Sequence, residues 1–135
     1  MKTLDEKVLV AGQIRPGDLP SIAAEGVTMI VNNRPDGEEP GQPFAAEIEV
    51  AARAAGLGYR HIPVAGGLYP DQVQAMAEAL EAANGKTLAF CKSGTRSTYL
   101  WALSRVQAGD APDELVRKAA AAGYDLTPIM PYLGC

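Results

Sequence analysis

Apolar and polar residues along this chain fall into two alternating patterns: short β-branched runs and longer segments with apolar residues at helical spacing. The short runs predict strands over residues 8–12, 27–32, 59–64 and 87–90. The helical spacing predicts helices over residues 18–25, 44–55, 70–83, 95–107 and 112–122, followed by an apolar tail over 126–133. Because strands and helices alternate, the chain is typical of an α/β domain with a central, mostly parallel sheet flanked by helices.

Within the predicted helices, the spacing indicates which side chains face the core. Val73, Met76 and Leu80 form an apolar stripe. In the helix over 95–107, Leu100, Trp101 and Leu103 are expected to pack inward, and Ser104 and Arg105 to face outward.

Two connections lack regular patterning. Residues 33–43 are rich in proline and glycine, which predicts a long loop, and long loops in compact domains are usually functional. Residues 65–69 form a shorter, glycine-containing link between the third predicted strand and the helix over 70–83.

Composition narrows the possible functions. The 135 residues, 47% apolar and 21% charged, fit a single domain over 1–135. A net charge of −4 disfavours nucleic acid and acidic membrane surfaces as partners. The N-terminus has no signal-like apolar run and no window is long enough for a membrane span, so a cytoplasmic protein is expected. One histidine and no close cysteine pair predict no metal, and no cofactor is expected.

The most informative segment lies between the last predicted strand and its helix, and reads Phe90-Cys91-Lys92-Ser93-Gly94-Thr95-Arg96-Ser97. Backbone amides at the start of a helix bind anions, and Gly94 permits the tight turn that this requires. The same environment stabilises a thiolate, and an arginine can bind an oxyanion in a bidentate manner, through two parallel hydrogen bonds. The segment therefore predicts a cysteine-based anion-binding loop. The alternative is a small buried cysteine at a strand end, without chemistry.

The candidate catalytic residues are Cys91 and Arg96. The candidate substrate-binding residues are Lys92, Ser93, Gly94, Thr95, Ser97 and Arg34. Lys92 is expected to raise the local potential rather than to contact substrate. Ser97 either donates to the cysteine sulfur or caps the loop, and Arg34 is either a substrate ligand or a solvated charge. Cys135 is either a second reactive thiol or a tail residue.

Nearly the whole chain resembles a bacterial family of tyrosine-phosphatase-like (dual-specificity-phosphatase-like) fold. That family also forms the amino-terminal domain of beta-lactamase-hydrolase-like sulfur enzymes. The likeness runs through Gly12-Gln13-Ile14, the segment 31–36, His61-Ile62-Pro63-Val64 and the loop 91–97. The resemblance implies phosphatase-like or rhodanese-like sulfurtransferase chemistry, and a functional link to a persulfide dioxygenase.

Two departures from typical tyrosine phosphatases favour sulfur transfer. Only four residues separate Cys91 from Arg96, as in rhodaneses, whereas typical tyrosine phosphatases have one more. The link after residues 62–64 reads Ala65-Gly66-Gly67 and lacks the usual aspartic acid, which leaves Asp36 and Asp71 as candidate general acids. Expulsion of sulfite from thiosulfate needs little help from an acid.

The sequence thus favours a sulfurtransferase that moves sulfane sulfur from thiosulfate or a polysulfide through a Cys91 persulfide to a thiol such as glutathione. Arg34 and Arg60 could bind the carboxylates of that acceptor. The first alternative is a phosphatase acting through a Cys91 phosphocysteine, and the second is a non-catalytic oxyanion-binding or sulfur-carrier module. His61 is expected to be a packing residue, and Tyr69 and Tyr99 either line the mouth of the site or belong to the core.

Overall fold

The structure is a computed structural model that describes residues 1–134, so the expectations for Cys135 lie outside the described residues. Its strands are β1 (Lys2–Thr3), β2 (Val8–Ala11), β3 (Val27–Asn32), β4 (Gly58–His61) and β5 (Lys86–Phe90). Its α-helices are α1 (Leu19–Ala24), α2 (Ala45–Ala54), α3 (Pro70–Ala82), α4 (Thr95–Gln107), α5 (Pro112–Ala121) and α6 (Met130–Leu133). Two 3₁₀ turns, η1 (Pro16–Asp18) and η2 (Thr127–Ile129), precede α1 and α6.

The five strands form one sheet in the order β1-β2-β5-β3-β4. Neighbours among β2, β5, β3 and β4 run parallel, which confirms the predicted mostly parallel sheet. Only β1 is antiparallel, at the edge beside β2. This strand was not predicted, because its exposed Lys2 and Thr3 carry no apolar signal. The turn into β2 is held by Asp5, whose carboxylate accepts hydrogen bonds from the backbone amides of Lys7 and Val8.

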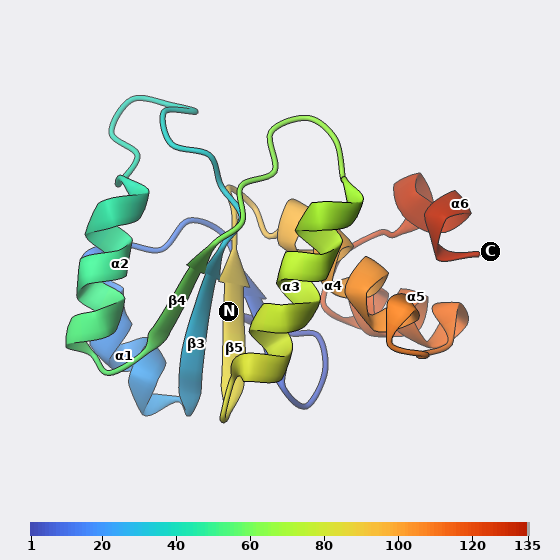
Figure 1. The fold of residues 1–135 in the computed structure, drawn as a ribbon, viewed down its shortest axis with the longest axis horizontal. Helices are drawn as coiled ribbons and strands as arrows, with labels where there is room; N and C mark the ends of the chain where they lie inside the picture. Colours follow the sequence, from blue (N-terminus) through green and yellow to red (C-terminus); the bar gives the residue numbers. More distant parts are fainter. Residues whose placement is uncertain (135) are drawn as a thin grey trace.

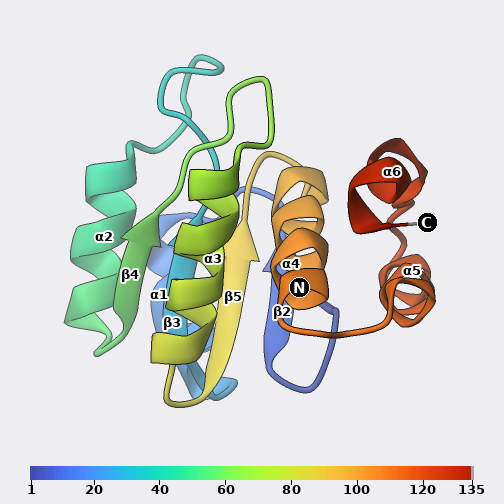
Figure 2. The ribbon, with the colours of Figure 1, turned by 45° about the vertical axis from the view of Figure 1, so that its right-hand side comes forward.

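Helices cover both faces of the sheet, as the two ribbon views show (Figure 1, Figure 2). Successive strand residues point to opposite faces. On β5, Ala89 packs in the core beneath α3, α4, α5 and α6, whereas Leu88 and Phe90 pack in the core beneath α1 and α2. Both cores are closed to solvent, and they hold β5 rigidly in the middle of the sheet.

Two expectations about packing and element bounds were wrong. Ser104 is 2% exposed instead of facing solvent, and its hydroxyl donates to the carbonyl of Trp101. Helix α4 contacts α3, α5, α6 and β5, so little of its surface is left for polar residues. The third predicted strand, over 59–64, ends earlier, at His61, although the amides of Ile62 and Val64 still donate to the carbonyls of Asn32 and Asn33.

The predicted apolar tail over 126–133 contains the 3₁₀ turn η2 and the short helix α6.

Replacement of Trp101 by alanine should lower the free energy of unfolding by about 3–5 kcal/mol, as for other large core aromatic side chains. Trp101 is fully buried, and its indole Nε1 donates to Asp5 Oδ2 at 2.9 Å, so the change removes both packing and a hydrogen bond. Urea unfolding measures the loss. Val50→Ala, on an exposed face of α2, is the control and should change stability by less than about 0.5 kcal/mol. A Trp101 variant as stable as this control would contradict the assigned core.

Candidate functional site

Cys91 directly follows β5, at the carboxyl end of the sheet, where ligands gather in folds of this class. β5 is hydrogen-bonded to β2 on one side and to β3 on the other, and this register fixes the position of Cys91 at the carboxyl end of the sheet. Its side chain is fully buried. The loop that follows crosses directly into α4 at Thr95 (Figure 2).

One backbone amide of this loop points at the sulfur. The amide of Gly94 donates to Cys91 Sγ at 3.1 Å, which places a hydrogen-bond donor where a thiolate would carry its charge. Gly94 has φ of +90°, a conformation that a residue with a Cβ rarely adopts. On the other side, a Cβ at Gly12 would lie 3.0 Å from the carbonyl oxygen of Lys92, so glycine is needed for the chain after β2 to approach.

Arg96 lies beside the sulfur but binds a carboxylate of the protein itself. Its Nη1 and Nη2 donate to the two oxygens of Glu38 at 2.7 and 2.8 Å, and Nη1 also donates to the carbonyl of Val64. The hydrogen bonds to Glu38, and to a smaller extent the negative charge of Cys91, raise the pKa of Arg96. The guanidinium thus presents a two-pronged oxyanion site close to Cys91, and Glu38 fills it.

Arg34 is 1% exposed and shares Glu38 with Arg96. Its Nε donates to Glu38, its Nη1 to Gln13 and its Nη2 to Glu39, at 2.9 to 3.0 Å. Burial lowers the pKa of Arg34, but the hydrogen bonds to Glu38 and Glu39 outweigh this and leave it raised. The Arg34 guanidinium was predicted as a possible ligand for the carboxylates of an acceptor molecule. In the structure, all three of its nitrogens donate to side chains of the protein itself.

Glu38 bridges the two arginines. Hydrogen bonds from Arg96 and Arg34 lower the pKa of its carboxyl to about 2, against the opposing effect of burial. At neutral pH Glu38 is therefore an anion that holds the 33–43 loop over the cysteine loop. The sequence predicted a functional loop but not the role of Glu38 in it. The available signal was the adjacent acids Glu38 and Glu39 in a loop predicted to lie near the two arginines assigned to the site.

The remaining predicted substrate-binding residues lie in the same loop with different contacts. Lys92 is exposed and its Nζ lies 3.8 Å from Glu39. The hydroxyls of Ser93 and Thr95 share a hydrogen bond at the surface. Ser97 takes neither expected role, because its buried hydroxyl donates to Asn33 Oδ1 at 2.7 Å and so ties α4 to the end of β3. Asn33, Gln13 and Tyr124, which donates to the carbonyl of Ser93, were not predicted.

Neither candidate general acid is positioned for that role. Asp36 accepts a hydrogen bond from the amide of Ala45 at the start of α2, and Asp71 lies in the exposed first turn of α3. His61 is exposed at the end of β4, where its Nε2 bonds to the carbonyl of Arg34, and is therefore not a core residue. Arg60 is also exposed.

An apolar groove of about 860 Å³ adjoins Arg96. The link over 65–69, α4 and the C-terminal segment form its walls, and Arg96 is the charged residue among them. Apolar and aromatic side chains line it, including Leu68, Tyr69, Tyr99, Leu103, Ile129 and Tyr132. Tyr69 and Tyr99, for which the sequence left two roles open, both face this groove.

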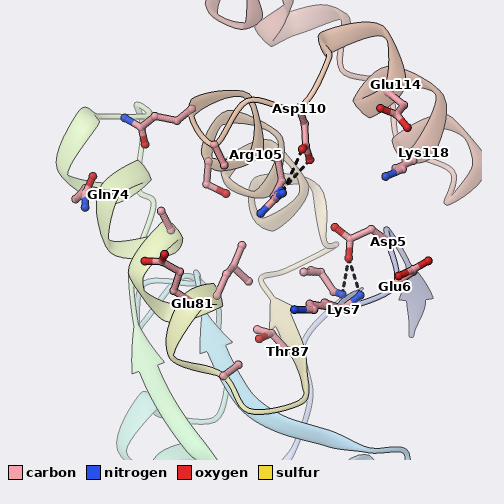
Figure 3. A pocket seen from close by; sticks show the side chains of 17 residues that line it. Asp5, Glu6, Lys7, Gln74, Glu81, Thr87, Arg105, Asp110, Glu114 and Lys118 are labelled. Atoms are coloured by element: carbon pink, nitrogen blue, oxygen red, sulfur yellow. Dashed lines mark hydrogen bonds and ion pairs between the residues drawn. The ribbon is translucent and has the colours of Figure 1, made fainter.

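A larger cavity, of about 1110 Å³, lies at the other end of the sheet, near the residues that begin β2 and β5 (Figure 3). Charged side chains of both signs line it, among them the ion pair of Arg105 and Asp110. It is remote from Cys91, which follows the last residue of β5. Over residues 1–134 no cluster of three metal-ligating side chains occurs, and no helix there has the length and apolar character of a membrane span.

A mostly parallel sheet flanked by helices, with a cysteine on the loop after its middle strand and an arginine in the first turn of the helix that follows, is the arrangement of tyrosine-phosphatase-like proteins. Solved structures of that class share the fold, among them Tk-PTP in its active form (20% identity, TM-score 0.74, 98% of this chain and 92% of that one). Residues 1–109 match the phosphatase-like domain of beta-lactamase hydrolase-like proteins. The chain belongs to this family.

Individual relatives support the assignment. The chain is 40% identical over 116 residues to the beta-lactamase hydrolase-like protein of Agrobacterium fabrum, and 39% identical over 137 residues to that of Xylella fastidiosa. These matches cover 82% and 98% of this chain but only 27% and 32% of the relatives, so the chain spans less than a third of their length. A candidate phosphatase from Neisseria meningitidis is 34% identical, with a TM-score of 0.85, covering 98% of this chain and 94% of that one.

The comparisons confirm the predicted fold and the family resemblance. They describe a phosphatase-like domain, and so support the phosphatase alternative better than the sulfurtransferase that the sequence favoured.

Replacement of Glu38 by glutamine should tighten the binding of inorganic phosphate or sulfate by roughly three- to tenfold. A free anion must displace the Glu38 carboxylate from Arg96, and a neutral amide competes less well. Isothermal titration measures the affinity, with Glu49→Gln on exposed α2 as the control. Weaker anion binding in the Glu38 variant would mean that the carboxylate holds Arg96 in place for the ligand instead of competing with it.

The same carboxyl predicts how stability depends on pH. Its pKa in the folded protein, about 2, lies below the ordinary value of 4.5, so its ion pairs contribute stability above about pH 4.5. That contribution is lost as the pH falls from 4.5 towards 2. The midpoint temperature of thermal unfolding should therefore fall more steeply over this range for the native protein than for Glu38→Gln. Parallel pH profiles would show that the ion pairs add nothing to stability.

Proposed function

We propose that this domain is a cysteine-dependent phosphatase for monoesters with weakly basic, apolar leaving groups, with Cys91 as nucleophile. The carrying observation is the two-pronged contact of Arg96 with a carboxylate beside the sulfur, because a phosphoryl group offers the same pair of oxygens. The family assignment and the Neisseria relative point to the same class.

In the proposed reaction, the phosphate group of the ester replaces the Glu38 carboxylate on Arg96. The Cys91 thiolate, stabilised by the amide of Gly94, attacks phosphorus, so that an S–P bond forms and the ester P–O bond breaks. The leaving oxygen departs with the bonding electrons and takes a proton from water. Water then attacks the phosphocysteine, which releases inorganic phosphate and regenerates the thiolate.

The choice of leaving group follows from the acids at the site. The link over 65–69 contains no acidic residue, and Glu38 is ionised at neutral pH, so neither donates a proton to the departing oxygen. Aryl oxides leave without that help more readily than alkoxides. The apolar groove beside Arg96 gives an aryl group a surface on which to lie.

Sulfur transfer is the second candidate, favoured by the four-residue spacing between Cys91 and Arg96 and by the same lack of an acid. In that reaction the thiolate attacks the outer sulfur of thiosulfate, forming an S–S bond while the S–S bond of the donor breaks and sulfite leaves. A thiolate acceptor such as glutathione then takes the outer sulfur and frees Cys91.

Intact-protein mass spectrometry separates the two candidates. The protein is incubated briefly with an aryl phosphate and quenched in acid, and a second sample is incubated with thiosulfate. The phosphatase proposal predicts a phosphoryl adduct that is absent in Cys91→Ser, together with steady phosphate release. It also predicts a larger loss of turnover in Arg96→Ala than in Lys92→Ala, because only arginine offers the two-pronged contact.

Each other result has a definite meaning. A gain of one sulfur atom on Cys91, discharged by glutathione and without any phosphoryl adduct, would replace the proposal by the sulfurtransferase. If the protein binds anions but forms no adduct and shows no turnover with either donor, the domain is the non-catalytic oxyanion-binding module instead of an enzyme.

A further inference from the structure

The peptide unit that joins Ser93 and Gly94 is held at both ends. Its N–H belongs to Gly94 and donates to Cys91 Sγ at 3.1 Å. Its C=O belongs to Ser93 and accepts a hydrogen bond from the hydroxyl of Tyr124 at 2.9 Å. In a trans peptide these two groups point in opposite directions. A hydrogen bond that fixes the carbonyl therefore also fixes the amide that faces the sulfur.

From this geometry we infer that Tyr124 is a positioning residue for the nucleophile: its hydroxyl fixes the Ser93–Gly94 peptide so that the Gly94 amide faces the Cys91 sulfur. Tyr124 acts on the sulfur through the peptide that lies between its hydroxyl and Cys91 Sγ.

The loop needs such a restraint because its own backbone does not supply one. Gly94 has φ of +90° and, as a glycine, adopts conformations of either sign at little cost. A rotation of the peptide by half a turn would point the Ser93 carbonyl oxygen at the sulfur, and the negative end of that dipole would disfavour a thiolate. Holding the carbonyl from outside excludes this rotation.

Tyr124 also closes the space into which the peptide would turn. A Cβ added at Gly94 would clash with the hydroxyl of Tyr124 and would lie 2.9 Å from its Cζ. The ring thus lies directly against Gly94, which makes glycine necessary there for a second reason besides its positive φ.

The position of Tyr124 is itself fixed by the C-terminal part of the domain. Its amide donates to the carbonyl of Ala119 at the end of α5, and buried Leu126 follows two residues later. Burial, and after it the negative charge of Cys91, raise the pKa of the Tyr124 phenol, in agreement with its closeness to the sulfur. Tyr124 lies outside residues 1–109, the span that matches the phosphatase-like domain.

The test compares Tyr124→Phe with the native protein by titrating the ultraviolet absorbance of the Cys91 thiolate. Each protein is measured against its own Cys91→Ser counterpart, which subtracts the absorbance of the groups that titrate independently of Cys91. Arg96 and Tyr124 are the groups whose pKa values respond to the charge of Cys91, and Arg96 stays protonated throughout. Loss of one hydrogen bond should reduce the thiolate-to-thiol ratio about three- to tenfold, which moves the midpoint upward by roughly half to one pH unit.

The control is Asp125→Ala, next in the chain. Asp125 accepts hydrogen bonds from the amide and hydroxyl of Thr127 and so organises the same segment without a hydrogen bond to the cysteine loop. It should leave the midpoint unchanged. An unchanged midpoint in Tyr124→Phe, or an equal shift in Asp125→Ala, would overturn the assignment. Because the titration needs no substrate, its outcome is independent of whether the domain transfers phosphoryl groups or sulfur.

Discussion

The site depends first on the burial of β5 between two layers of helices. This strand is paired on both edges, and its side chains enter a core on each face, so its last residue has one position in the domain. Because Cys91 is the next residue, its position is fixed as well. The loop that follows can be short because α4 begins only four residues later, against the same core. The packing that stabilises the fold thus also fixes the position of Cys91.

The charges around this loop are balanced by the protein itself. Arg34 and Arg96 bring two cations to one place, where they would repel each other without an anion between them. Glu38 supplies the anion in the structure. The long loop over 33–43 is therefore more than a connection, since it carries the carboxylate that binds both arginines.

Residues from five separate parts of the chain meet at this site. The turn after β2 contributes Gly12 and Gln13, the loop after β3 contributes Arg34 and Glu38, and the link after β4 contributes the carbonyl of Val64. The segment after α5 contributes Tyr124. The carboxyl ends of parallel strands bring the first three together with Cys91, as expected for this architecture. Tyr124 arrives differently, from a segment that packs outside α4.

The sequence by itself determined the parallel α/β fold, the position of Cys91 after a buried strand and the start of α4 after Gly94. These are local patterns, set by hydrophobic spacing and by the turn chemistry of glycine. Which charges meet was decided only by the tertiary structure, because Glu38 and Arg96 are far apart in the chain and their contact depends on how the loop folds back. The burial of Ser104, the partner of Ser97 and the contact of Tyr124 have the same origin, since each depends on which elements pack together.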